Sequence, residues 1–357
     1  LIEEPFDVAF LCLHGKGGED GVLQGFLETI GLPYTGPGVW SSATAMNKAQ
    51  SKLFYQREGI PTAPYQYIKK GEGYSVQELA LAMGGTCVVK PATEGSALGI
   101  YIVEGEEAIA DAIERVTFEL VEDLAKEGVE YAELRFAPQF SIKDGLTQDE
   151  VVEAAIRGAE RGMKMYPQIR VGLILCCMRG ADNEELNMQT VETAKKYLGD
   201  VVCAVDIAGA EGLFPTENFA PVFAKVREYG VPMTLHAGEA AGPDSMKTAL
   251  SFGTKRIGHG VAAINDPELI KRLIDENVTL EVCVTSNYHT KVVPAINMHP
   301  IHKLLEAGVH VTVNSDNRTC SRTTLQKEKE VLKEELGFTD EEIEKMQEYA
   351  WEARFLK

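Results

Sequence analysis

Several features that mark common classes of protein are missing from this 357-residue sequence. The seven cysteines form no Cys-x-x-Cys pair, so neither a cysteine zinc site nor a disulfide framework is indicated. No apolar run approaches the ~20 residues that cross a bilayer, and no signal peptide is visible. Basic residues number 35 against 54 acidic ones, and the net charge of -19 argues against nucleic acid or an anionic membrane as main partner. We therefore expect a reduced, cytoplasmic protein that binds neither.

Histidine is scarce as well. There are seven histidines, and no His-x-His sequence occurs among them. Apolar content of 45% and a length of 357 residues suffice for two domains or one large barrel. The sequence begins at Leu1 and enters a strand-like run, FDVAFLCLHG, at once. Because this start lies inside a core-like segment, we expect that a preceding segment is missing.

The most informative stretch is TLHAGE, residues 234–239. An apolar run leads into His236, and Glu239 follows after Ala-Gly, as at a buried strand that opens into a loop. A histidine and a glutamate delivered to one place suit a metal ligand beside an acid/base group. The pattern of an apolar run ending in a polar group recurs at His259 and at Asp316-Asn317.

Strand-like and helix-like segments alternate from about residue 113 to 357. Near-continuous apolar strands between helices indicate a parallel sheet covered by helices. The predicted strands number seven, one fewer than a (β/α)8 barrel requires, and lie near 129–136, 170–177, 201–207, 233–236, 256–258, 279–284 and 310–314. In such barrels the polar groups at the carboxyl ends of the strands form the active site. Here those groups are Arg135, Asp206, Gly209, His236, Glu239, His259, Ser286, Asn287, Asp316 and Asn317.

The motifs YAELRFAPQ, DIAGAE, TLHAGE, RIGHG, LEVCVTSN and VTVNSDNR, in this order, resemble adenosine deaminase, a metal-dependent amidohydrolase barrel. NSDNR resembles the bacterial branch of that family. The resemblance covers about residues 113–357 and implies hydrolytic, zinc-dependent deamination of adenosine or deoxyadenosine to an inosine product plus ammonia. It implies the following roles: His236 and Asp316 as zinc ligands, Glu239 as the proton donor to purine N1, His259 as the group that orients or deprotonates the water, Gly209 as a backbone contact to the purine, and Asn317 as a contact to N7.

One part of the family pattern is absent. The resemblance implies a first strand with His-x-His, which supplies two further zinc ligands, and this sequence contains no His-x-His. Catalytic zinc usually has three protein ligands. We therefore expect an incomplete barrel that lacks its first strand, an incomplete zinc site and impaired activity.

Residues 1–112 carry a different set of motifs. HGKGGEDGVLQGFLE, LPYTGPGV, AMNKAQSK and VVKPATEGSALG resemble D-alanine–D-alanine ligase of the ATP-grasp superfamily, which makes a peptidoglycan precursor. The resemblance implies a substrate side with His14 and Glu19, and ATP-binding residues Lys48, Lys90 and Ser96. Asn47 and Ala97 depart from the family pattern. The family's C-terminal half, with the residues that hold Mg²⁺, does not follow, and phosphoryl transfer depends on that metal. The expected ATP/Mg²⁺ site is therefore incomplete.

The expected fold is α/β: a truncated ATP-grasp ligase fragment over 1–112, followed by the incomplete (β/α)8 TIM-type barrel over 113–357. The join is expected within residues 106–116, where EEAIADAIERV fits a helix of either family. Three functions remain open: a zinc deaminase with an N-terminal appendage, an ATP-dependent ligase, and a non-catalytic chimera. The sequence leaves the oligomeric state open.

Overall fold

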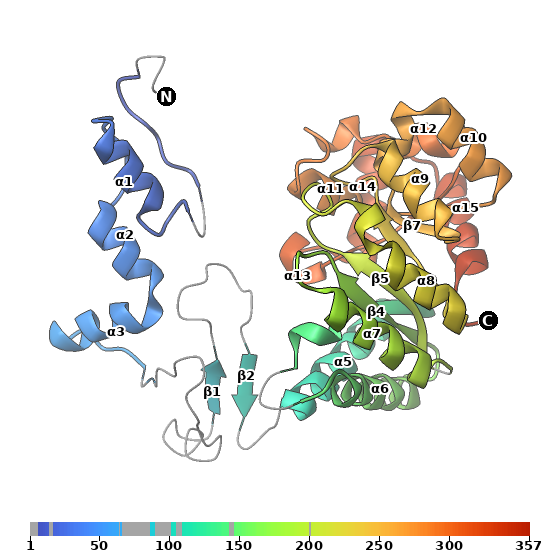
Figure 1. Cartoon of the computed structure of the whole chain (residues 1–357), viewed down its shortest axis with the longest axis horizontal. Coiled ribbons are helices and arrows are strands. Elements are labelled where there is room, and N and C mark those ends of the chain that lie inside the picture. The colour runs from blue at the N-terminus through green and yellow to red at the C-terminus, as the bar shows by residue number, and fades with distance from the viewer. Residues whose placement is uncertain are drawn as a thin grey trace. The chain divides into compact units, whose positions relative to one another are not determined.

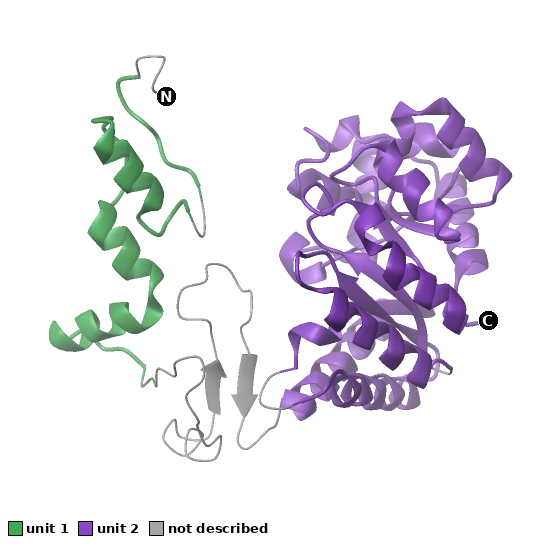
Figure 2. Cartoon of the chain, viewed as in Figure 1, with its two compact units in different colours: residues 1–108 green, residues 109–357 purple. Residues whose placement is uncertain are grey.

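The computed structural model describes residues 6–13, 17–63, 65, 86–89, 101–104, 109–142, 146–199 and 201–357. The chain divides into two compact units, Leu1–Ala108 and Ile109–Lys357 (Figure 2). No helix among the described residues combines the length and apolar character needed to cross a membrane.

The described residues of unit 1 form three short helices and two paired strands. Its elements are α1 (Val22–Thr29), α2 (Val39–Met46), α3 (Lys48–Arg57), β1 (Thr86–Val89) and β2 (Tyr101–Glu104), and the two strands pair antiparallel. The sequence predicts a strand over 7–13, but its described part makes only an isolated bridge between Ala9 and Tyr34. Asn47, which departs from the ligase family pattern, caps α3. Its side-chain oxygen accepts the backbone N–H groups of Ala49 and Gln50.

The described part of unit 1 has a small core. Leu27 and Leu32 are buried, whereas ten large apolar side chains are exposed: Phe6, Val8, Phe10, Leu13, Val22, Phe26, Trp40, Leu53, Tyr55 and Ile60. Apolar burial is the main favourable contribution to folding, so these residues alone contribute little stability to unit 1.

The described residues of unit 2 form seven parallel strands in two ladders, as the alternating pattern predicts. One ladder joins β3 (Tyr131–Phe136), β4 (Arg170–Met178) and β5 (Val202–Ala208). The other joins β6 (Leu235–Ala237), β7 (Arg256–His259), β8 (Thr279–Val282) and β9 (His310–Val313). A parallel bridge between Val205 and Met233 connects β5 to the start of β6, so sequence order is kept around the sheet. All the strand carboxyl ends therefore lie at one end of it.

Helices alternate with these strands (Figure 1). The α-helices are α5 (Ile109–Lys126), α6 (Gln148–Met165), α7 (Glu184–Tyr197), α8 (Ala220–Tyr229), α9 (Pro243–Ser251), α10 (Pro267–Asp275), α11 (Val284–His289), α12 (Ile301–Glu306), α13 (Arg318–Ser321), α14 (Leu325–Leu336) and α15 (Asp340–Ala353). Short 3-10 helices are η1 (Pro138–Phe140), η2 (Thr216–Phe219), η3 (Val261–Asn265) and η4 (Ile296–Met298).

Local sequence signals set several helix ends. Thr147 and Glu150 form a capping box at the start of α6, in which each side chain bonds the other residue's backbone N–H. Asp266 caps α10, whose first residue is Pro267. Gly230 ends α8 with a φ of 66°, a left-handed conformation that glycine adopts at little cost. Together these signals fix where the chain leaves a helix to enter the next strand.

Helix α5 crosses the predicted join and packs on α6. A Cβ at Gly162 of α6 would lie 2.6 Å from Val121 Cγ1, so the two helices approach too closely for any larger residue there. Arg157 and Arg161 of α6 also form ion pairs with Glu114. The structural division falls at Ala108/Ile109, and a boundary at 112/113 would fall inside this continuous helix.

Candidate active site

The carboxyl ends of β6, β7 and β9 bring together four of the predicted residues. His236 lies in β6, Glu239 in the loop after it, His259 at the end of β7, and Asp316 just beyond β9. The ring centroids of His236 and His259 are 5.0 Å apart, and His259 Nε2 lies 3.6 Å from Glu239 Oε2. Three strands far apart in sequence thus deliver two imidazoles and two carboxyl groups to one place.

Two of these residues have a strained backbone. His259 has a φ of 62° and Asp316 a φ of 52°, in the left-handed region that side chains other than glycine rarely adopt. Such a conformation costs on the order of 1–3 kcal/mol and persists where the surrounding structure enforces it, often at functional sites. Both residues lie at the carboxyl ends of their strands, and this conformation places both side chains at the same end of the sheet.

His236 is held by a buried carboxylate. Its Nδ1 lies 2.7 Å from Asp206 Oδ2, and Asp206 is fully buried at the end of β5. Arg135 Nη1 also donates to Asp206 Oδ2, at 2.8 Å. Burial alone would lower the pKa of His236, but the negative charge and hydrogen bond of Asp206 raise it above its ordinary value. Because Nδ1 is engaged, His236 has its Nε2 available for a ligand.

Asp316 and Asn317 occupy the turn after β9. Ser286 Oγ donates to Asp316 Oδ2 at 2.7 Å. Burial opposes ionisation, but this hydrogen bond and the charges of His259 and His236 hold the pKa of Asp316 below its ordinary value. Asn317 caps α13 by accepting Cys320 N–H at 2.9 Å, which leaves its side-chain NH₂ group as a donor. Gly209, exposed just beyond β5 with a φ of 111°, keeps its predicted place at a strand end.

Glu211 organises the loop that carries Glu239, a role that the sequence reasoning missed. The Glu211 carboxylate accepts the backbone N–H groups of Gly238, Glu239, Ala240 and Ala241 at 2.7–3.1 Å. Burial opposes ionisation, but hydrogen bonds from Ser245 and from this loop lower the pKa of Glu211. The motif DIAGAE contains Glu211, and its position two residues after Gly209 is the only signal that could have indicated it.

Cys283 is a second residue that the reasoning did not single out. It follows β8 and is buried, and one donor atom each of His259, Cys283 and Asp316 lie within 4.8 Å of one another. Among the described residues this is the group whose donors could hold a metal ion. Ligands 2.0–2.3 Å from one tetrahedral ion stand roughly 3.3–3.8 Å apart, so only a modest contraction would be needed.

His299 also differs from expectation. Its place just before a helix suggests a solvated cap, but it is only 5% exposed. Its Nε2 lies 3.2 Å from Asn287 Oδ1, and Asn287 Nδ2 lies 3.0 Å from His259 Nδ1. His299 is therefore linked to the candidate site through one buried amide.

A chain of largely buried ion pairs connects the strands next to the candidate site. Glu133 pairs with Arg256, Arg256 with Glu281, Glu281 with Arg135, and Arg135 with Asp206, at 2.5–2.8 Å. Each link joins two different strands, and the last carboxylate holds His236. The chain thereby couples the core of the sheet to the position of one candidate ligand.

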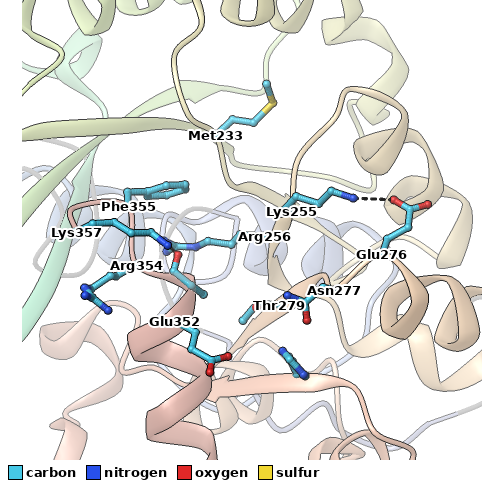
Figure 3. A pocket seen from close by; sticks show the side chains of 12 residues that line it. Met233, Lys255, Arg256, Glu276, Asn277, Thr279, Glu352, Arg354, Phe355 and Lys357 are labelled. Carbon is cyan, nitrogen blue, oxygen red and sulfur yellow. Dashed lines mark hydrogen bonds and ion pairs between the residues drawn. The ribbon is translucent and has the colours of Figure 1, made fainter.

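A cavity of about 410 Å³ lies at the opposite ends of the strands (Figure 3). Its walls include Arg256, Thr279 and His310, the first residues of β7, β8 and β9, together with residues 352–355 and Lys357. Parallel α/β barrels place their chemistry at the carboxyl ends of the strands, so this cavity is separate from the candidate site.

The predicted ligase-type residues are only partly within the described chain. Glu19 is exposed in the turn before α1, and Lys48 is half-buried at the first position of α3. His14, Lys90 and Ser96 lie outside the described residues.

Comparisons with known proteins confirm the resemblance to both families. The adenosine deaminase family profile matches residues 103–357, whereas the profiles of the D-ala D-ala ligase N-terminus and C-terminus match residues 2–37 and 54–137. The deaminase and ligase matches overlap over 103–137, around the predicted join.

Two curated relatives are adenosine deaminases. That of Haemophilus ducreyi is 41% identical over 252 residues, covering 70% of this chain and 72% of the relative. That of Clostridium kluyveri is 40% identical over 259 residues, covering 72% and 73%.

Solved structures agree on the fold of unit 2. The N6-methyl-AMP deaminase of Arabidopsis thaliana aligns with a TM-score of 0.63 and 28% identity over 70% of this chain and 74% of that one. An amidohydrolase of Burkholderia ambifaria with bound Zn aligns with a TM-score of 0.66 and 22% identity over 70% and 69%, a likeness of fold. With its family profile matched over residues 103–357 and relatives at about 40% identity, the chain belongs to the adenosine deaminase family.

Proposed function

We propose that the chain is a zinc-dependent hydrolytic deaminase that converts adenosine or deoxyadenosine to the inosine product and ammonia. The observation that carries the proposal is the gathering of His236, Glu239, His259 and Asp316 at the carboxyl ends of three strands. Hydrolysis at C6 of a purine requires an activated water, an acid for the ring nitrogen and a group that directs the water, and these residue types supply those functions.

The residues divide the work as follows. Glu239 delivers a proton to purine N1, and its carboxyl group is positioned by Thr290 Oγ1, which donates to it at 3.2 Å. His259 orients or deprotonates the water that adds to C6. The side-chain oxygen of Asn317 is engaged in the cap of α13, so the NH₂ group of Asn317 is the part that faces the purine. It donates a hydrogen bond to N7, which is an acceptor. The backbone of Gly209 contacts the purine, and the C6 amino group leaves as ammonia.

The donor set supports a zinc ion. His236 Nε2 and the Asp316 carboxylate would hold it, and a histidine whose other nitrogen bonds a carboxylate, as here with Asp206, is common at zinc sites. The Cys283 thiol, within 4.8 Å of an Asp316 carboxylate oxygen, is a further donor of a type that zinc accepts. When bound, zinc would lower the pKa of a water molecule to about 7, which would make hydroxide available at neutral pH.

Because the sequence contains no His-x-His, we propose that the deaminase activity is impaired. We attribute that absence to a barrel without its first strand, so that β3 and β9 would be its edges. We further propose that unit 1 derives from two parts of a D-alanine–D-alanine ligase. Its few buried apolar residues among those described support a fragment, and its ATP/Mg²⁺ site would be incomplete. We place the chain in the cytoplasm because its cysteines form no disulfide framework.

Adenosine turnover by the full chain tests the function. With zinc supplied, we expect inosine and ammonia to form in equal amounts, and Glu239→Gln to lower kcat by about 10²–10⁴-fold, the usual contribution of a positioned acid. Glu268→Gln, exposed in the first turn of α10, is the matched control and should leave kcat unchanged. Wild-type protein that forms no inosine in zinc-supplemented buffer would contradict the proposal.

A further inference from the structure

We propose that a buried relay from Ile301 through His299 and Asn287 fixes the ring of His259 with its proton on Nε2, so that His259 acts on the reacting water as a hydrogen-bond donor. This inference rests on the proposed function and decides between the two roles left open for His259. His299 and Asn287 are positioning residues in this account, because neither reaches the substrate.

The relay begins at a backbone amide, which can only donate. Ile301 N–H donates to His299 Nδ1 at 3.1 Å, in the first turn of α12. A neutral imidazole has one donor and one acceptor nitrogen, so His299 must carry its proton on Nε2. Burial lowers the pKa of His299 to about 4, which keeps this ring neutral at pH 7.

The amide of Asn287 links the protonation of His299 to that of His259. His299 Nε2–H donates to Asn287 Oδ1 at 3.2 Å, so Asn287 must direct its NH₂ group the other way. That group lies 3.0 Å from His259 Nδ1, which must accept. If the Asn287 amide were reversed, its NH₂ group would face His299 Nε2–H, and two donors would meet. His299 could not adjust, because Ile301 N–H can only donate and therefore keeps the proton of His299 on Nε2. The proton of neutral His259 is therefore on Nε2.

The surroundings hold the relay in place. Asn287 is 0% exposed, His259 3% and His299 5%, so water does not compete for these hydrogen bonds. The Asn287 backbone carbonyl accepts N–H groups from Val292 and Val293, which secures the turn after α11. An unmade hydrogen bond in such an environment is costly, so each member enforces the orientation of the next.

The free end of the relay faces the reacting groups. His259 Nε2 lies 3.6 Å from Glu239 Oε2, too far for a hydrogen bond. An Nε2–H at this position donates to the oxygen that adds to C6 and leaves proton acceptance from that water to other groups.

The tautomer of His259 in the metal-free full chain is the first test, because it does not depend on deaminase activity. Nitrogen-15 NMR of histidine-labelled protein at pH 7 should show Nε2 protonated and Nδ1 unprotonated. His259→Gln identifies the signal by its loss. A proton on Nδ1 of neutral His259 would overturn the relay even if adenosine were turned over. The expected tautomer in a chain without turnover would leave the relay standing and overturn the function.

Two variants give the relay a second readout. Asn287→Asp replaces the donor by an acceptor, so His259 should gain a proton on Nδ1, and kcat should fall by about 10²–10⁴-fold with KM little changed. His299→Gln retains a donor toward Asn287, so it should keep the tautomer and most of kcat. His302→Gln is the matched control, since His302 bonds Glu342 and lies outside the relay. An unchanged His259 tautomer in folded Asn287→Asp protein would also overturn the proposal.

Discussion

Glu281 shows how single residues hold the site from below. Its carboxylate lies between Arg135 and Arg256 and also accepts Thr234 Oγ1–H at 2.9 Å. Burial opposes ionisation, but the two guanidinium groups hold the pKa of Glu281 well below its ordinary value of 4.5. A lowered pKa in the folded state stabilises the protein above the unfolded-state pKa, and the contribution is lost as pH falls.

Glu281→Gln should therefore destabilise unit 2 by up to about 3–5 kcal/mol at pH 7, because it leaves two partly buried cations without their carboxylate. The difference from wild type should shrink as pH falls below 4.5, where wild-type Glu281 progressively loses its advantage. Urea unfolding over a pH series measures both effects, with the exposed Glu334→Gln as control. A difference that stays constant with pH would show that the charge of Glu281 has no such role.

At the scale of elements, the contact between α5 and α6 depends on glycine. A Cβ at Gly162 would lie 2.6–2.7 Å from Cγ1 and Cβ of Val121, and the second of these atoms cannot move without shifting the α5 backbone. The steric cost exceeds the gain of about 1 kcal/mol that alanine brings to a helix interior.

Gly162→Ala should lower the free energy of unfolding by about 1–3 kcal/mol, measured by chemical denaturation. Val121→Ala added to Gly162→Ala should recover part of that loss, since it removes the clashing methyl groups. Gly199→Ala is the comparison, because a Cβ there meets nothing within 4 Å. If Gly162→Ala were as stable as wild type, α5 would not pack as closely as described.

The order of elements in unit 2 could be predicted, because apolar runs, caps and glycine stops are local signals. The gathering of four candidate residues in one place could also be predicted, since strand carboxyl ends meet at one end of a parallel sheet. Cys283, Glu211 and His299 were missed for a physical reason: their roles depend on which loops converge. His299 precedes a helix as a cap would, yet it lies against Asn287 from another loop. In unit 1, the predicted strand over 7–13 needs a partner, and its described residues make only one bridge.

At the scale of the whole molecule, the chain combines a unit of the adenosine deaminase family with segments that match ligase family profiles. The overlap of the deaminase and ligase matches over 103–137 places α5 and β3 where either family model fits. In the structure α5 belongs with unit 2, where it packs on α6. All the residues proposed for deamination lie in unit 2, so that unit carries the central claim.

Zinc titration of metal-free full chain tests that claim most directly. Wild-type protein should bind about one zinc per chain, the number that one catalytic site requires, and inosine formation should rise with zinc until that equivalent is reached. His236→Ala removes a proposed ligand and should lose both the tightly bound zinc and the turnover. Wild-type protein that binds no zinc and forms no inosine, or turnover that is independent of zinc, would contradict a zinc-dependent deaminase.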